Sequence, residues 1–132
     1  MSEFAPHNGH YKRICGFGVD VVTISRMRKA HQKWGDPFLA RIFTQDEIDY
    51  CLAKANPYPS LGARFAAKEA AFKALSQTGV QVARWHDLEV LRSPEGQPCL
   101  LAPTVDGIEL HLSLSHTKDM AIAMVVAEKG HE

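Results

Sequence analysis

Residues 64–75 read R-F-A-A-K-E-A-A-F-K-A-L and predict the helix around which the rest of the chain is organised. The stretch contains no Gly, Pro or β-branched residue, and five of its twelve residues are Ala, the best helix former. At about 100° per residue, the large apolar side chains fall on one stripe and the alanines on a second face. The stripe consists of Leu61, Phe65, Phe72 and Leu75. The alanine face permits close packing against another helix or a sheet.

Three charged residues occupy unusual positions on this helix. Glu69 and Lys73 are one helical turn apart, so they stack on one side and could form an ordinary surface ion pair. Both border the apolar stripe, however, which favours a position in a cleft. Lys68 falls inside the stripe, so either its ammonium group extends along the surface into water or it lines a cleft.

Composition and charge limit the classes of function. The chain has 132 residues, 45% apolar and 23% charged, which is typical of one soluble globular domain. Fifteen basic residues balance fifteen acidic ones, so net charge predicts no binding to nucleic acid or to a membrane surface. Three widely spaced cysteines without a C-x-x-C motif favour neither a zinc site nor a disulfide framework. With no membrane-spanning run or signal peptide recognisable, we expect a cytoplasmic protein.

A strand is predicted at residues 14–22 (I-C-G-F-G-V-D-V-V), after an expected flexible tail over residues 1–13. In regular alternation Gly16, Gly18 and Asp20 share one face, and the missing side chains let another element approach the backbone. The other face is apolar and carries Cys15, Phe17, Val19 and Val21. A lone carboxylate is costly to bury, so Asp20 is either a turn residue or a metal ligand.

The helix predicted at residues 24–34 has a basic face. Arg26, Lys29 and Lys33 recur at i, i+3 and i+7, with Arg28 beside them, and the helix contains no acidic residue. Such a face is most often only solvated. Because its charges have no partner on the same helix, docking of an acidic partner becomes a second interpretation.

Two further helix starts are indicated before the strands. Thr44 and Glu47 have the spacing of a capping box, which predicts a short helix from that point. Residues 56–59 read N-P-Y-P and predict a break, after which Ser60 is the expected N-cap of the central helix.

Strands dominate the rest of the chain. Residues 87–92 and 99–102 flank a turn signal and predict a hairpin, and alternation predicts a strand at residues 109–115. The continuous apolar run at residues 120–127 predicts a strand buried on both faces. An N-terminal strand, several helices including a long central one, and then antiparallel strands predict an α+β domain over residues 14–132.

Two carboxylates are the strongest candidates for chemistry. Asp20 and Glu69, together with water and phosphate oxygens, suit Mg²⁺, which takes few protein ligands. Lys73, one turn beyond Glu69, is placed to hold or protonate a phosphate leaving group. A serine hydrolase is disfavoured, because Ser115 and His116 are neighbours on a strand and point to opposite faces, and the G-x-S-x-G motif is absent.

Four motifs follow one another in a fixed order. They are G-F-G-V-D-V-V-T-I-S-R at residues 16–26, F-T-Q-D-E at residues 43–47, the central motif at residues 64–75, and L-S-L-S-H-T at residues 112–117. Together they resemble the holo-[acyl-carrier-protein] synthases, the small 4′-phosphopantetheinyl transferases, over roughly residues 14–127. The resemblance implies the fold of that family. It also implies transfer of 4′-phosphopantetheine from coenzyme A to a serine of apo-acyl carrier protein, releasing 3′,5′-ADP and supporting fatty acid biosynthesis.

The resemblance also implies roles for individual residues. Asp20 and Glu69 correspond to the ligands of Mg²⁺, which Mn²⁺ could replace. Lys73 corresponds to the lysine beside the coenzyme A diphosphate, and Arg64 to a further phosphate contact.

Other parts of the motifs imply contacts with the nucleotide and with the carrier protein. His116 and Thr117 correspond to residues that contact the coenzyme A nucleotide. Arg26 lies on the helix that docks the carrier, so Arg28 and Lys29 beside it are candidate contacts too. Members of this small type are generally homotrimers with active sites between protomers.

The chain departs from the family pattern after the central helix. The family commonly has G-T-G there, whereas this chain has S-Q-T-G at residues 76–79, one residue longer. Two rival functions remain, a non-catalytic piece of a larger synthase and a regulator that senses coenzyme A. The intact set of Asp20, Glu69 and Lys73 favours the enzyme.

Overall fold

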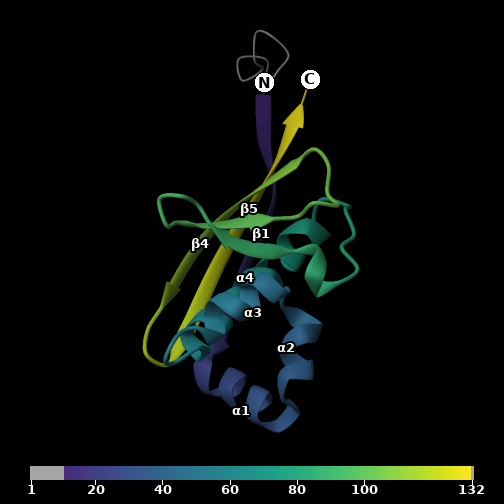
Figure 1. Cartoon of the computed structure of the whole chain (residues 1–132). Helices are drawn as coiled ribbons and strands as arrows, with labels where there is room; N and C mark the ends of the chain where they lie inside the picture. The colour runs from purple at the N-terminus through teal and green to yellow at the C-terminus, as the bar shows by residue number, and fades with distance from the viewer. Residues whose placement is uncertain (1–10, 132) are drawn as a thin grey trace.

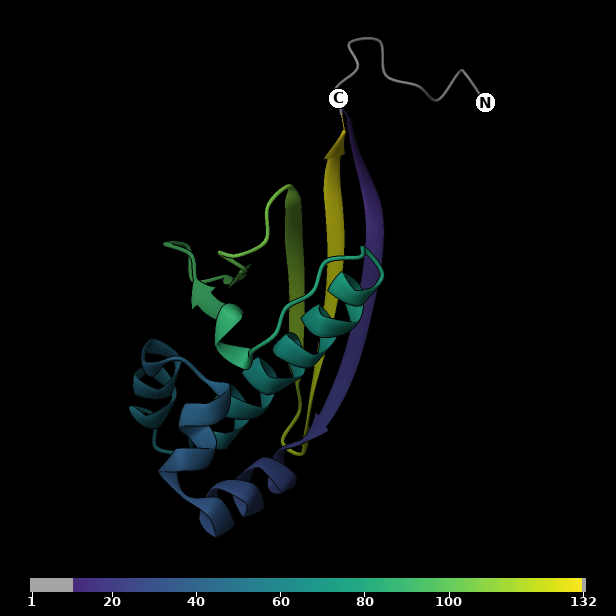
Figure 2. The same ribbon diagram turned by 90° about the vertical axis from the view of Figure 1, so that its right-hand side faces the viewer.

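A three-stranded antiparallel sheet and one long helix form the centre of the fold (Figure 1). The computed structural model describes residues 11–131. The sheet has the order β1-β5-β4, formed by β1 (Tyr11–Thr23), β5 (Met120–His131) and β4 (Ile108–His116). The central helix α4 (Tyr58–Ser76) lies across one face of the sheet (Figure 2). The predicted α+β class, with its long central helix, is confirmed.

Two glycines let α4 lie directly against β1. A methyl group on Gly18 would overlap the carbonyl oxygen of Ala70, and one on Gly16 would overlap that of Ala74. The facing alanines of α4 are fully buried: Ala66, Ala67, Ala70, Ala71 and Ala74. The glycine-lined strand face and the alanine face of the helix, both predicted from the sequence, are therefore each other's partners.

The strand β1 differs from the prediction in its start and in its alternation. It begins at Tyr11, three residues before the predicted start, while residues 1–10 of the expected tail lie outside the described part of the chain. A bulge between Ile14 and Gly16 interrupts the pairing with β5. Cys15 consequently packs against the core, where its thiol lies 3.4 Å from the carbonyl oxygen of Ala127. Its predicted place on one face with Phe17, Val19 and Val21 was wrong.

Three short helices surround the first half of α4. They are α1 (Ile24–Trp34), α2 (Asp36–Ile42) and α3 (Gln45–Leu52). Thr44 and Glu47 form the predicted capping box at α3. The central helix begins at Tyr58, because prolines are tolerated in a first turn, so Ser60 is inside the helix and not its N-cap. None of the described helices is long and apolar enough to cross a bilayer.

Lys68 joins α4 to its neighbours through a buried ion pair. Its ammonium group lies 2.7 Å from Glu47 Oε1, and neither side chain is exposed to solvent. It also donates hydrogen bonds to three backbone carbonyls, those of Ile42, Trp85 and Leu88. Lys68 therefore neither reaches into water nor lines a cleft, and both predicted alternatives were wrong.

The predicted hairpin is present and closes the core beside α4. A short 3₁₀ turn, η2 (Trp85–Asp87), precedes β2 (Glu89–Arg92), which pairs with β3 (Pro98–Leu101). The strand is thus shorter at its start than residues 87–92. Leu88, Val90 and Leu100 bring its apolar side into the core cluster.

One face of the sheet is uncovered within the described chain, and the part of it formed by β1 and β5 is apolar (Figure 2). Alternate residues of β5 are buried under α4, but Ile122 and Met124 between them are exposed, so the prediction of burial on both faces was wrong for a single chain. We call this surface the outer apolar face. It carries Ile14, Phe17, Val19, Val21, Met120, Ile122 and Met124, each 44–56% exposed.

Candidate active site

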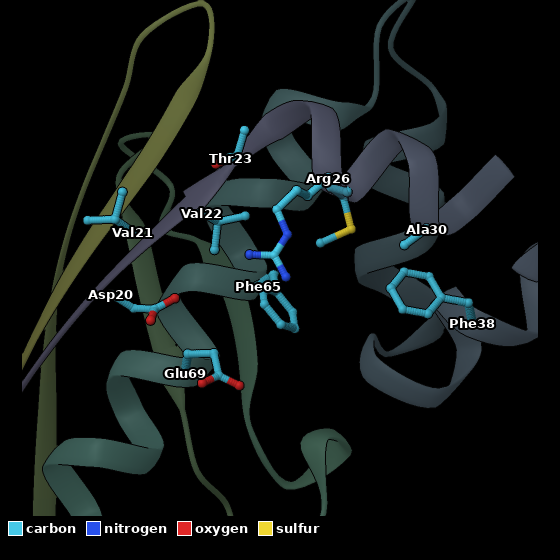
Figure 3. A pocket seen from close by; sticks show the side chains of 10 residues that line it. Asp20, Val21, Val22, Thr23, Arg26, Ala30, Phe38, Phe65 and Glu69 are labelled. Carbon is cyan, nitrogen blue, oxygen red and sulfur yellow. The ribbon is translucent and has the colours of Figure 1, made fainter. Parts of the chain in front are cut away.

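A pocket of about 400 Å³ opens where β1 runs into α1, beside the middle of α4 (Figure 3). Asp20 from β1 and Glu69 from α4 line one side of it, and the guanidinium group of Arg26 reaches in from α1. The remaining lining is mostly apolar: Val21, Val22, Thr23, Met27, Ala30, Phe38 and Phe65. The structure thus brings together two acids that are 49 positions apart in the sequence.

The close packing of α4 on β1 explains why these two acids meet. The backbone of Ala70 lies against Gly18, so the residue before Ala70 and the residue two after Gly18 come to the same place. Those residues are Glu69 and Asp20. The glycine that allows the contact therefore also sets the geometry of the pocket.

The electrostatics of the pocket favour a bound cation. Burial raises the pKa of Glu69 above its ordinary value, and the negative charge of Asp20 raises that pKa further, while Lys73 lowers it. Among residues 11–131, Glu69 has no hydrogen bond or ion pair. A carboxylate that is partly desolvated and repelled by a second one gains most from a positive ligand.

Lys73 contacts Asp20, and not Glu69 as the helical spacing suggested. Its ammonium group lies 3.2 Å from Asp20 Oδ1 and donates a second hydrogen bond, 3.0 Å long, to the carbonyl oxygen of Val19. The Lys73 side chain is half-exposed, so a ligand can reach it. Lys73 therefore neutralises part of the charge of the pair from the α4 side.

Gln77 is a residue that the sequence analysis did not assign. Its side-chain oxygen accepts a hydrogen bond from the backbone N–H of Phe17 (3.0 Å), and its amide nitrogen donates to the carbonyl of Phe17 (2.8 Å). These bonds connect the edge strand β1 to the end of α4 at Phe17, which is three residues before Asp20. Gln77 belongs to the S-Q-T-G departure, which was the only signal for it in the sequence.

The other residues with a predicted role in coenzyme A binding lie outside the pocket. Arg64 is buried on the α3 side, with its guanidinium carbon 4.5 Å from the ring centre of Tyr50 and its Nε without a hydrogen-bond partner. His116 ends β4 and Thr117 follows it in the turn to β5; both are exposed. That turn is tied to the start of α1, because the N–H of Ile24 donates to the carbonyl of Asp119.

The basic face of α1 adjoins the pocket. Arg26 and Lys29 are exposed, and Arg28 is half-buried with its guanidinium carbon 5.3 Å from the ring centre of Tyr58. Because Arg26 also lines the pocket, a partner bound along this face would lie next to Asp20 and Glu69. The sequence predicted the face but not the entry of Arg26 into the pocket.

The sequence analysis also did not assign Phe65, an aromatic residue that lines the pocket, to the site. Phe65 was assigned to the apolar stripe of the central helix, and it does pack against core residues, stacking on Trp85 at 5.3 Å between ring centres. It also lines the pocket. The helical pattern alone cannot distinguish a side chain that fills a core from one that walls a cavity.

Comparison with known proteins identifies the family. The family model of the 4′-phosphopantetheinyl transferase superfamily matches residues 16–125. A holo-[acyl-carrier-protein] synthase of Koribacter versatilis is 44% identical over 124 residues, covering 87% of this chain and 98% of that protein. One of Chlamydia trachomatis serovar D is 43% identical over 119 residues, covering 86% and 98%.

Solved structures show the same relationship. The holo-(acyl-carrier-protein) synthase of Bacillus anthracis, crystallised in complex with CoA (3′,5′-ADP), superposes with a TM-score of 0.75 at 33% identity, covering 88% of this chain and 97% of that one. The Helicobacter pylori enzyme in complex with coenzyme A gives 0.73 at 32% identity, covering 84% and 98%. The sequence, the fold and the length all agree, and the chain belongs to the 4′-phosphopantetheinyl transferase superfamily, among the holo-[acyl-carrier-protein] synthases.

Proposed function

We propose that this chain transfers the 4′-phosphopantetheine group of coenzyme A to a serine of an apo-acyl carrier protein, giving holo-carrier protein and 3′,5′-ADP and so supporting fatty acid biosynthesis. The main observation in its favour is the pocket that joins Asp20, Glu69 and Arg26 next to Lys73. Relatives that share nearly the whole chain bear the name of this activity, and two of their structures contain coenzyme A or part of it.

Asp20 and Glu69 fit a divalent cation such as Mg²⁺, or Mn²⁺ in its place. The donor groups are carboxylate oxygens, and the residues that line the pocket include no His or Cys, which suits a hard ion. Glu69 has no hydrogen bond or ion pair among the described residues and a raised pKa, so a bound cation would stabilise its ionised form. When bound, the ion would offset negative charge that develops on the diphosphate.

The residues of the chain then have separate tasks in the transfer. The serine oxygen of the carrier forms a bond to the phosphorus that carries pantetheine, while the bond from that phosphorus to the oxygen of 3′,5′-ADP breaks. The ammonium group of Lys73, beside Asp20, offsets the charge on the departing 3′,5′-ADP. A carboxylate of the pair, or water held there, accepts the serine proton.

The carrier protein is proposed to dock on the basic face of α1, with Arg26, Arg28 and Lys29 as contacts for its acidic side chains. Arg26 belongs both to this face and to the pocket, so docking there would present a serine to the carboxylates. We expect Arg26→Glu to raise the Kd for apo-carrier most strongly at low ionic strength, because salt screens exposed charges. Binding titrations at several salt concentrations measure this effect, and an unchanged salt dependence would contradict docking on α1.

The active enzyme is proposed to be a homotrimer in the cytoplasm. The outer apolar face offers a surface for subunit contact. His116 and Thr117 are exposed and lie apart from the pocket of their own chain, as residues would if they completed the coenzyme A site of a neighbouring protomer. Their proposed role in binding coenzyme A rests on that arrangement, whereas a phosphate contact by the buried Arg64 rests on the motif alone.

One incubation tests the transfer directly. Purified chain, apo-carrier, coenzyme A and Mg²⁺ are mixed, and the carrier is weighed by mass spectrometry. We expect a gain equal to one phosphopantetheine group. Asp20→Ala or Glu69→Ala should lower turnover by at least about 10²-fold, the scale of losing one electrostatic stabiliser. Full activity in both variants would reject the carboxylate pair as the reaction centre.

The same material separates the rival functions. A regulator that senses coenzyme A would bind it in a calorimetric titration without modifying the carrier. A structural piece of a larger synthase would show neither binding nor transfer.

A further inference from the structure

A second group of side chains that could hold a metal ion lies on the sheet, away from the pocket. Glu109 and His111 of β4 and Glu128 of β5 each offer one ligand atom, and these three atoms lie within 4.8 Å of one another. His111 Nε2 is 2.6 Å from Glu128 Oε1 and 4.0 Å from Glu109 Oε1. None of the three belongs to the proposed transfer site.

The strand register creates this group. Glu109 stands directly opposite Glu128 in the pairing of β4 with β5. His111 is two residues further along β4, so it projects from the same face as Glu109. A cation between the two carboxylates would have an oxygen ligand from each strand, and a neutral His111 would supply it with a nitrogen ligand.

The chemistry of the donors selects the ion. Zn²⁺ binds both imidazole nitrogen and carboxylate oxygen, whereas Mg²⁺ prefers oxygen alone. We propose that Glu109, His111 and Glu128 bind a divalent transition-metal ion of the Zn²⁺ type, with water at the fourth position. The site would be distinct from the Asp20–Glu69 pair in its place and in its choice of metal.

The geometry requires only small side-chain rotations. Zn²⁺ bonds of about 2.0–2.2 Å place tetrahedral ligands roughly 3–3.5 Å apart. The His111–Glu128 distance of 2.6 Å must therefore lengthen, and the His111–Glu109 distance of 4.0 Å must shorten. All three side chains are at least a quarter exposed, so they can rotate while the paired strands stay in place. A bound ion would link β4 to β5.

The chain offers a matched control for this site. His31 Nε2 lies 3.1 Å from Asp36 Oδ1, but its other nitrogen contacts the hydroxyl of Tyr58, and no second carboxylate joins them within the described residues. This His–Asp pair has one histidine, like the proposed site, but too few ligands. His31→Ala should therefore leave zinc binding unchanged.

Calorimetric titration of the tag-free full-length chain with ZnCl₂ in metal-free buffer tests the proposal. All proteins carry Asp20→Asn and Glu69→Gln, so that zinc cannot bind at the pocket. We expect His111→Ala to lose one zinc ion per chain, or to bind it at least about tenfold more weakly, since even the loss of a supporting residue costs 10- to 100-fold. Glu109→Gln should weaken binding too, because it removes a carboxylate but keeps the His111–Glu128 contact.

Two outcomes would overturn the site. The first is zinc binding that is equal in the parent, His111→Ala and Glu109→Gln, which would mean that His111 only shares a proton with Glu128. The second is a zinc position elsewhere in crystals measured at the zinc absorption edge. Zinc binding is measured with Asp20 and Glu69 replaced and transfer is measured with both intact, so this result and that for the transfer reaction can be separated.

Discussion

Glu69 shows at the scale of one residue how a binding site is kept at the expense of stability. Its carboxyl group is partly desolvated, lies near Asp20 and has no hydrogen-bond partner in the described chain. Each of these features opposes its ionisation. A residue selected for stability alone would be neutral here, so the arrangement is better explained by a positive ligand.

This leads to a prediction about stability and pH. Because the pKa of Glu69 is raised in the folded chain, the folded state keeps the proton at pH values where the unfolded chain has lost it. The stability of the wild-type chain therefore falls as the pH rises above the ordinary value of 4.5. Glu69→Gln removes this loss, so with EDTA present it should be more stable than wild type at pH 7 and equally stable near pH 4.

Thermal unfolding at a series of pH values measures the difference. Adding Mg²⁺ should stabilise the wild type and have little effect on Glu69→Gln. Glu95→Gln, which changes an exposed carboxyl group in the β2–β3 turn, serves as the control. A Glu69→Gln variant that is less stable than wild type at pH 7 in EDTA would show that Glu69 stabilises the fold and would remove this explanation of its environment.

At the scale of elements, Lys68 joins segments that local structure alone would leave separate. It connects α4 to the end of α2, to α3 through Glu47, and to the residues around η2. Glu47 in turn accepts a hydrogen bond from the N–H of Val90 in β2. Burial lowers the pKa of Lys68, and the charge of Glu47 raises it. The ion pair is therefore sensitive to the loss of either partner.

We expect Lys68→Met to destabilise the chain by about 3–5 kcal/mol, because it leaves the carboxylate of Glu47 buried without its cation. The double variant Lys68→Met, Glu47→Leu should recover part of this loss, since no buried charge then remains. Equilibrium unfolding in urea measures both. Lys118→Met in the exposed β4–β5 turn is the control, and a Lys68→Met variant as stable as this control would contradict the role of the ion pair.

The elements that could be predicted are those whose sequence signal comes from residues close together in the chain. The alanine face of α4, the capping box at Thr44 and the alternation of β4 each depend on residues a few positions apart. The sequence predicted that both the alanine face and the strand face with Gly16 and Gly18 pack closely against another element. It did not predict that these two faces pack against each other. The bulge at Cys15 was not visible, because it depends on the register with β5.

The sequence predicted that Asp20 and Glu69 belong to one site, but it predicted only part of the geometry around them. Asp20 and Glu69 were chosen by residue type and motif, and the structure brings them to one pocket. Contacts made by long side chains across the fold were missed: Lys68 with Glu47, Lys73 with Asp20, and Gln77 with Phe17. Each joins residues 21 to 60 positions apart, and local periodicity carries no signal at that range.

At the scale of the whole molecule, the outer apolar face is the feature that one chain leaves unexplained. It lies on the two paired strands β1 and β5, on the side opposite α4 (Figure 2). A contiguous apolar surface of this kind marks an interface in most soluble proteins. The continuous apolar run of β5, which predicted burial on both faces, is what a strand requires when a second subunit covers its outer side.

We therefore expect Val19→Glu, on this face, to convert the proposed trimer into monomers and to abolish transfer, because the proposed active sites between protomers would be lost. Light scattering coupled to size-exclusion chromatography measures the mass, and the carrier assay measures the activity. Leu101→Glu is the matched control, because Leu101 is 44% exposed, close to the 49% of Val19, but belongs to β3. A wild-type chain that is monomeric and active at the assay concentration, or a Val19→Glu variant of unchanged mass, would show that this face does not assemble the enzyme.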